Sequence, residues 1–144
     1  MSVAVCTSDK GGALGPEPCY NLAEAMGITR IQFTVAHPIE VDRSAEVELP
    51  VDTGAVISFV PRAILESLGI PRQSRRAFRL ANGQTIERDV GGALFGWNGY
   101  TSIAPVAFAE LGDASLLGVT ALEAMGLEVD PTTRRLKPTD LLAV

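Results

Sequence analysis

Two Asn-Gly dipeptides, Asn82-Gly83 and Asn98-Gly99, constrain the fold of this chain more than any other feature of its sequence. An Asn-Gly pair between two strand-like segments favours a type I′ turn, because both central residues of that turn need a positive φ. Strand-like segments flank both pairs, within residues 78–87 and 93–108. Trp97 and Tyr100, on either side of the second pair, predict a packed cross-strand pair. Two adjacent hairpins therefore predict an all-β core.

Strict alternation of apolar and polar residues predicts further strands before the first hairpin. The alternating apolar positions are Ile31, Phe33 and Val35 in one strand, and Val47, Leu49 and Val51 in the next. An apolar run over residues 56–60 predicts another strand, and residues 127–137 predict a last hairpin.

Two short helices are predicted among these strands. Pro61 suits the first position of a helix, and Gly69 suits the left-handed residue that ends one. Thr120, followed three residues later by Glu123, has the pattern of a capping box, and Gly126 suits the end of that helix.

The domain is predicted to occupy residues 26–144, because the preceding segment has no sustained period. Residues 1–25 are rich in Gly and Pro and are interpreted as a poorly structured N-terminal extension. Cys6 and Cys19, the only two cysteines, both lie there. We interpret them as free thiols of a reducing compartment, with a disulfide between them as the alternative.

Charge and composition exclude several classes of function. The formal net charge of −5 argues against a general nucleic-acid-binding protein. No run of apolar residues is long enough for a membrane-spanning helix, and no signal peptide is recognised, so we expect a cytoplasmic protein without a membrane partner. His37 is the only histidine, and no cluster of histidine and carboxylate residues suggests a metal.

The segment that carries chemistry is Asp52-Thr53-Gly54-Ala55, at the end of an apolar strand. Gly54 permits a close approach of the backbone to the carboxylate. The tripeptide alone is also compatible with a plain turn, because aspartate caps turns with its own side chain. Its context favours a functional aspartate over a plain turn. A predicted hairpin tip follows it, and Leu116-Leu117-Gly118 precedes a short predicted helix near the end of the sequence.

This layout resembles the retropepsin-like aspartic proteases, the family of the retroviral proteases and their small single-domain bacterial relatives. The resemblance covers residues 28–137. It implies a closed all-β acid-protease barrel with one or two short helices, which forms one half of a homodimer. It also implies an aspartic endopeptidase that acts on peptide or protein substrates without a cofactor.

The resemblance assigns roles to individual residues. It makes Asp52 the catalytic aspartate, Thr53 the residue whose hydroxyl interlocks the two active-site loops of the dimer, and Gly54 the small residue beside the carboxylate. The substrate pocket and the flap correspond to Ala55, Val56, Leu80, Ala81, Asn82, Gly83 and Gln84. The strand beneath the active-site loop corresponds to Leu116, Leu117 and Gly118.

Peptide hydrolysis of this kind needs two carboxylates. One takes a proton from water, and the other, protonated, donates a hydrogen bond to the scissile carbonyl. Two carboxylates about 3 Å apart share one proton, as is established for the dyad of aspartic proteases. The sequence contains a single Asp-Thr-Gly, so the second aspartate must come from an identical chain related by a two-fold axis.

Other interpretations remain open beside this one. The main alternative is a catalytically weak or inactive retropepsin-like module for dimerisation or peptide binding. Apolar Val56 differs from several retroviral members, which have an acidic residue there, and this difference concerns the substrate pocket rather than the dyad. A serine hydrolase is disfavoured, because Ser58 lacks the G-x-S-x-G context and His37 is the only possible base.

A basic run stands out against the acidic total. It consists of Arg72, Arg75, Arg76 and Arg79. We interpret these arginines as a solvated loop and the base of the flap, with attraction of an acidic peptide or nucleic acid as the alternative. Glu87 and Asp89, two residues apart on a predicted strand, are interpreted as a polar outer face.

Overall fold

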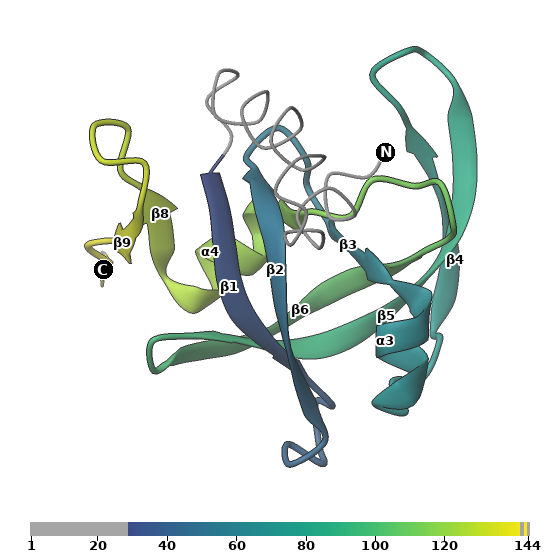
Figure 1. Ribbon diagram of the computed structural model, residues 1–144, viewed down its shortest axis with the longest axis horizontal. Helices are drawn as coiled ribbons and strands as arrows, with labels where there is room; N and C mark the ends of the chain where they lie inside the picture. Colours follow the sequence, from purple (N-terminus) through teal and green to yellow (C-terminus); the bar gives the residue numbers. More distant parts are fainter. Residues whose placement is uncertain (1–28, 142, 144) are drawn as a thin grey trace, which may run out of the picture.

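The computed structural model describes residues 29–141 and residue 143 (Figure 1). Its elements, in chain order, are β1 (Thr29–Ala36), β2 (Ser44–Asp52), β3 (Ser58–Pro61), α3 (Arg62–Ser67), β4 (Ser74–Arg79), β5 (Thr85–Trp97), β6 (Tyr100–Ala109), β7 (Leu117–Gly118), α4 (Val119–Met125), β8 (Leu127–Val129) and β9 (Leu136–Pro138). Strands predominate over the two short helices, which confirms the predicted all-β class. The extension over residues 1–25, with both cysteines, lies outside the described residues.

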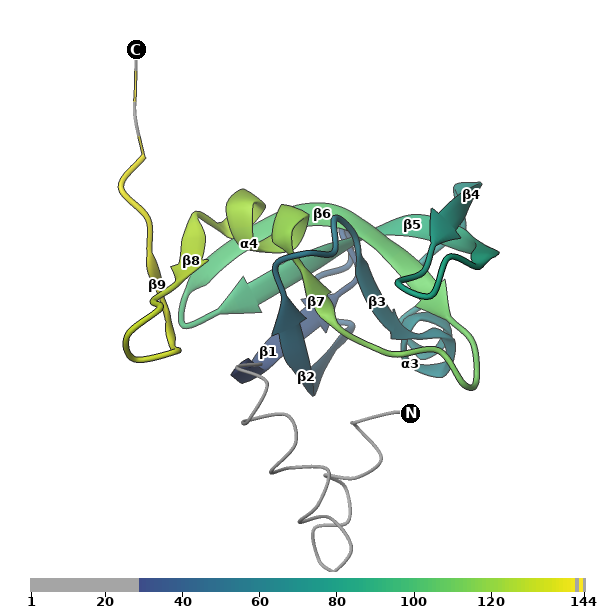
Figure 2. The ribbon, with the colours of Figure 1, turned by 90° about the horizontal axis from the view of Figure 1, so that it is seen from above.

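A single sheet contains seven of the strands, in the order β3-β6-β5-β1-β2-β7, with β4 paired to β5. β5 is 13 residues long and pairs with three strands, namely β4, β6 and β1. Figure 2 shows β5 and β6 running across the domain as one long curved hairpin. The same strand therefore belongs both to the projecting β4–β5 hairpin and to the centre of the sheet.

The closed barrel expected from the resemblance is not found among the described strands. Pairing leaves β3 and β7 as the two ends of an open path. β7 has only two residues and, among the described strands, pairs with β2 alone. Two backbone hydrogen bonds between Phe59 and Leu116, of 2.9 and 2.8 Å, nevertheless join the two ends through one isolated bridge.

The hydrophobic core follows the alternation seen in the sequence. All six alternating positions of β1 and β2 are buried: Ile31, Phe33, Val35, Val47, Leu49 and Val51. The ring of Phe33 lies 6.0 Å from that of Phe95, which is fully buried on β5. Burial of each large apolar side chain contributes about 1.5–3 kcal/mol, so this core accounts for much of the stability of the sheet.

Both helices end as predicted, but they begin differently. Gly69 and Gly126 have φ values of 75° and 76°, in the left-handed region that only glycine adopts readily. The predicted capping box is wrong, because α4 begins at Val119 and no side chain caps it. Main-chain groups take that role: the N–H groups of Val119 and Thr120 donate to the carbonyl oxygens of Ala55 and Val56.

α3 begins one residue later than predicted. Pro61 is its N-cap rather than its first helical residue, and Arg62 begins the helix. The helix packs an apolar side chain against the core, since Leu65 is fully buried.

The two Asn-Gly turns differ from each other. Asn98 and Gly99 have φ values of 50° and 89°, as a type I′ turn requires, and the rings of Trp97 and Tyr100 stack 6.4 Å apart, so both predictions are confirmed. At the first turn only Gly83 has a positive φ, of 91°, so a type I′ turn is the wrong prediction there. The N–H of Gly83 donates to the Leu80 carbonyl at 2.9 Å and the N–H of Leu80 to the Gln84 carbonyl at 2.8 Å, the pattern of a three-residue loop that ends in a glycine bulge. The side chain of Asn82 accepts a further hydrogen bond from the N–H of Gln84 at 2.9 Å.

In the part of the chain that the structure describes, no helix has both the length and the apolar character needed to span a membrane.

Replacement of Phe95 by alanine should destabilise the protein by about 3–5 kcal/mol, because the ring is fully buried and a cavity would remain. Ile103→Ala on the adjacent strand is the control: Ile103 is 56% exposed, and its loss should change stability by less than about 0.5 kcal/mol. Denaturant unfolding measures both free energies. Equal effects of the two substitutions would contradict the assignment of the core.

Candidate active site

A cleft of about 650 Å³ lies between three segments that are far apart in sequence. These segments are the turn joining β2 to β3, the end of β4 with the residues that follow it, and the loop before β7. In Figure 1 the β4–β5 hairpin rises from the body of the domain on the same side as the β2–β3 turn. The cleft is therefore bounded on one side by the turn that bears Asp52 and on another by the hairpin.

Asp52 is the last residue of β2, and its position is fixed by the backbone around it. The strand pairs in parallel with β7, so that Asp52 lies opposite Gly118. The N–H of Gly54 donates to Asp52 Oδ1 at 2.9 Å, and the N–H of Ala55 donates to the Asp52 carbonyl at 3.0 Å. A Cβ at Gly54 would lie 3.3 Å from the same carboxylate oxygen, so glycine suits this close approach.

The turn after Asp52 rests on β7 and on the start of α4. A Cβ at Gly118 would lie 2.8 Å from the carbonyl carbon of Ile57 and 3.0 Å from the Ala55 oxygen. The first two N–H groups of α4 donate to the carbonyls of Ala55 and Val56 at 2.8 and 3.1 Å. Contacts between main-chain atoms on both sides therefore hold the turn in place.

Ser58 supports the same turn, a function that the sequence did not reveal. The residue is fully buried, and its hydroxyl accepts a hydrogen bond of 2.8 Å from the N–H of Gly118. A buried hydroxyl engaged in this way is not accessible to a substrate, so Ser58 is a structural residue and not a nucleophile. A single small polar residue inside the apolar run 56–60 was the only signal in the sequence.

The predicted site residues divide into two groups. Those that line the cleft are Asp52, Gly54, Ala55, Val56, Leu80, Ala81 and Leu116. Those that do not line it are Thr53, Asn82, Gly83, Gln84, Leu117 and Gly118. The tip of the hairpin is exposed beyond the cleft, whereas Leu117 and Gly118 are buried beneath the turn.

Several lining residues were not predicted. They are Ile57, Phe59, Ala77, Phe78, Arg79 and Ala114. The rings of Phe59 and Phe78 meet edge to face at 4.9 Å and connect β3 to the hairpin. The sequence of β4, SRRAFR, has Phe78 as its one large apolar residue and shows no alternation, so the sequence pattern gave no indication that Phe78 faces the cleft.

Ion pairs fix the base of the hairpin. Arg72 donates to Glu66 at 2.6 Å and to Asp89 at 2.8 Å, and the first of these bonds lowers the pKa of Glu66. Arg75 lies 3.1 Å from Asp89 and 3.3 Å from Glu87. Glu87 and Asp89 thus form a polar face whose partners are arginines of the basic run.

A more buried ion pair connects the hairpin strand to the loop before β7. Arg88 donates two hydrogen bonds, of 2.7 and 2.8 Å, to the carboxylate of Asp113. Asp113 also accepts the N–H of Glu110 at 2.8 Å. The side chains of Arg88 and Asp113 are only 20% and 12% exposed, and the bond from Arg88 holds the pKa of Asp113 below its usual value.

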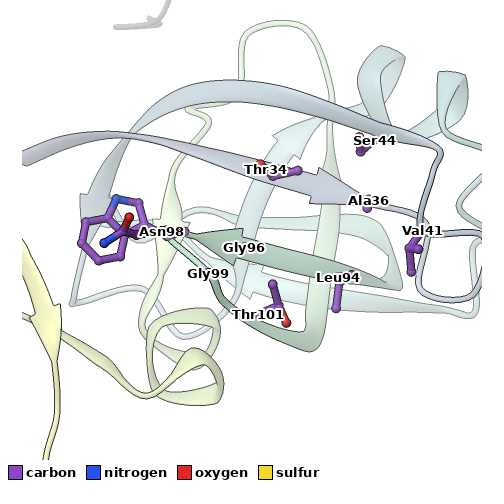
Figure 3. Close-up of a pocket in the computed structure, with 10 residues that line it drawn as sticks. Thr34, Ala36, Val41, Ser44, Leu94, Gly96, Asn98, Gly99 and Thr101 are labelled. Carbon is purple, nitrogen blue, oxygen red and sulfur yellow. The ribbon is translucent and has the colours of Figure 1, made fainter.

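A second pocket, of about 230 Å³, lies between β1, the loop after it and the β5–β6 hairpin (Figure 3). Its walls contain Trp97 and Asn98 but no ionisable side chain. It therefore offers no acid or base. His37 lies in the loop after β1, where its Nδ1 accepts hydrogen bonds from the N–H groups of Ile39 and Glu40.

Within residues 29–141, no three histidine, cysteine or carboxylate side chains lie close enough together to hold a metal ion. Comparison of the sequence with models of known protein families gives no match, and comparison with curated proteins gives none. The residues of the cleft are therefore the basis for the proposed function.

Replacement of Gly118 by alanine should displace the turn that follows Asp52, because the new methyl group would meet main-chain atoms at 2.8–3.0 Å. We expect a loss of about 1–3 kcal/mol in the free energy of unfolding, measured with denaturant. Gly92→Ala is the matched control, since the nearest atom to its Cβ would be 3.9 Å away. Equal effects of the two substitutions would contradict the close packing beneath the turn.

Replacement of Asp113 by asparagine should destabilise the protein by about 1–3 kcal/mol at neutral pH, because the bonds from Arg88 lose their charged acceptor. The pKa of Asp113 is lowered by folding, so its stabilising effect is complete above the ordinary value of 3.8 and disappears as pH falls through the lowered value. The difference in stability between wild type and variant should thus shrink below about pH 4. Asp42→Asn, on an exposed loop, is the control, and a pH-independent difference would contradict the ion pair.

Proposed function

We propose that the protein is a retropepsin-like aspartic endopeptidase that acts as a homodimer, with one Asp52 from each chain in a shared catalytic pair. One observation supports this proposal above the others. Asp52 ends a strand at the wall of a large cleft, its carboxylate is oriented by the N–H of Gly54, and a hairpin borders the opposite side. The carboxylate of Asp52 is exposed, and the main-chain N–H of Gly54 holds it in one orientation. A carboxylate positioned in this way suits acid–base chemistry.

Among the described residues that line the cleft of one chain, Asp52 is the only carboxylate, so the proposed reaction needs a second chain. Thr53 and Val56 beside Asp52 are exposed, Val56 to 66%, and this surface is suited to contact the partner. A two-fold axis beside Asp52 would bring the two carboxylates together.

In the proposed reaction, one carboxylate removes a proton from a bound water and the other, protonated, donates a hydrogen bond to the scissile carbonyl. The water oxygen bonds to the carbonyl carbon, the C–N bond breaks, and the leaving amine takes up the proton that the first carboxylate removed from water. The apolar walls of the cleft, among them Val56, Phe59 and Leu80, suit apolar side chains of a peptide. No cofactor takes part in these steps.

A second candidate function is a module that binds peptides or dimerises without efficient turnover. The described lining of one chain's cleft holds one carboxylate, which favours this candidate, since a dimer that held the two Asp52 side chains well beyond about 4 Å could not share a proton. The two candidates differ in one measurable property, namely hydrolysis that depends on Asp52.

The test is cleavage of a mixed peptide library at mildly acidic pH and high protein concentration, read by mass spectrometry. Asp52→Asn should reduce cleavage by about 10³-fold or more, because the variant cannot accept the proton of water. Activity of the wild type should rise more steeply than linearly with concentration below the dimer dissociation constant.

Asp42→Asn, a change of charge on a loop away from the cleft, is the control and should cut as the wild type does. A folded wild type that cuts nothing would favour the binding module. Equal cleavage by wild type and Asp52→Asn would show that another site or a contaminant is responsible.

A further inference from the structure

The cleft continues into a side pocket between the β4–β5 hairpin and the loop before β7, residues 110–116. This side pocket has a volume of about 220 Å³, and the residues that it shares with the cleft are Phe59, Leu80, Ala114 and Leu116. The residues that line it alone are Ile86 of the hairpin and Gly112 and Asp113 of the loop. One wall therefore belongs to the hairpin and another to the loop, so the separation of these two segments determines the shape of the pocket.

Neither of these walls is anchored in the hydrophobic core. No residue of the hairpin between 74 and 89 is buried, and none of residues 110–116 is buried. Gly112, with a φ of 93°, lies in the loop, and the neighbouring Leu111 is fully exposed. Since apolar packing contributes little here, the separation of hairpin and loop depends on polar contacts.

The direct bonds between the hairpin and the loop come from one face of β5. Arg88 lies two residues after Ile86, so both side chains are on the same face of the strand. The register with β4 places Ile86 opposite Phe78, whose ring contacts Phe59 on β3. This face therefore points toward the body of the domain, where the guanidinium of Arg88 donates its two hydrogen bonds to Asp113.

The geometry of this ion pair fixes a position as well as a contact. Two parallel N–H donors on one carboxylate determine both the distance and the relative orientation of the groups that carry them. The carboxylate of Asp113 is itself part of a turn, because the Asp113 N–H donates to the Glu110 carbonyl at 3.0 Å and the Glu110 N–H donates back to Asp113 Oδ2 at 2.8 Å. Both side chains of the pair are far less exposed than those of Arg75 and Glu87 on the outer face, so solvent and salt screen the pair less.

We propose that Arg88 and Asp113 are positioning residues, which hold the hairpin and the loop at the separation that lets the side pocket accept one apolar side chain of a bound peptide. This inference rests on the proposed function and deepens it, because it assigns the selection of a substrate side chain to an ion pair outside the reacting groups. The apolar residues Leu80, Ile86 and Leu116 of the pocket suit an aliphatic side chain such as leucine.

The experiment measures kcat and KM for peptides from the cleavage library, with each position in turn occupied by leucine or by alanine. At the position that enters the side pocket, Asp113→Asn should raise KM for the leucine peptide by about tenfold with kcat little changed, because the walls separate while Asp52 stays in place. KM for the alanine peptide should change little, so the preference for leucine is lost.

Arg88→Lys is the second variant, for the case that Asp113→Asn does not fold. Lysine keeps the positive charge but lacks the planar fork, so it retains the attraction and loses the fixed orientation. We expect the same rise in KM for the leucine peptide. The double variant Arg88→Lys, Asp113→Asn should raise KM no further than either single change, because one link is lost in all three.

Glu87→Gln is the matched control, since Glu87 lies on the same strand but its ion pair with Arg75 stays within the hairpin. It should keep the wild-type KM and the preference for leucine. A lower kcat with unchanged KM in the Arg88 and Asp113 variants overturns the inference, because loss of folded enzyme lowers the apparent kcat alone. An equal rise of KM in Glu87→Gln, or independent effects of the two changes in the double variant, also overturns it while the proposed function stands.

Binding distinguishes the failure of this inference from the failure of the proposed function. If the wild type cuts nothing, fluorescence anisotropy measures labelled alanine peptides with a single central leucine or serine against the wild type and Asp113→Asn. A preference for the leucine peptide that Asp113→Asn abolishes supports the inference although hydrolysis fails. Equal affinity of the two proteins for the leucine peptide overturns the inference as well.

Discussion

The architecture around Asp52 depends on the close approach between the main chain of Gly118 and the turn that follows β2. There is room for a glycine and for nothing larger, since an added Cβ would lie 2.8–3.0 Å from backbone atoms. The buried hydroxyl of Ser58 accepts the N–H of Gly118, and α4 begins directly above the carbonyls of Ala55 and Val56. Strand pairing, helix start and carboxylate position are thus parts of one arrangement, which local sequence alone does not specify.

The sequence predicted those parts of the fold that depend on neighbours along the chain. Alternation gave the buried faces of β1 and β2, and the left-handed glycines gave the ends of both helices. The prediction from sequence failed where a residue far away along the chain determines the local structure. The start of α4 is capped by carbonyls about sixty residues away in sequence rather than by Thr120. The first turn is a different case, since its departure from type I′ is accompanied by a local bond, from the N–H of Gln84 to the Asn82 side chain.

The candidate site was predictable to a similar extent. Asp52, Gly54 and the hairpin could be found from a short motif and its context, because each depends on a local turn. Ser58 and Phe78 could not, since their roles arise from contacts with Gly118 and Phe59 across the fold. The basic run showed no sign of which of its arginines form ion pairs, because only strand register determines which side chain reaches which carboxylate.

The length of β5 has a mechanical consequence. Its ladder with β4 ends at Val90, and its ladder with β1 begins at Leu94. Over the residues between, which include Gly91 and Gly92, only β6 pairs with it. The hairpin beside the cleft can therefore tilt about this stretch without loss of any hydrogen bond between β1 and β5, so access to the cleft and integrity of the core are governed by different parts of one strand.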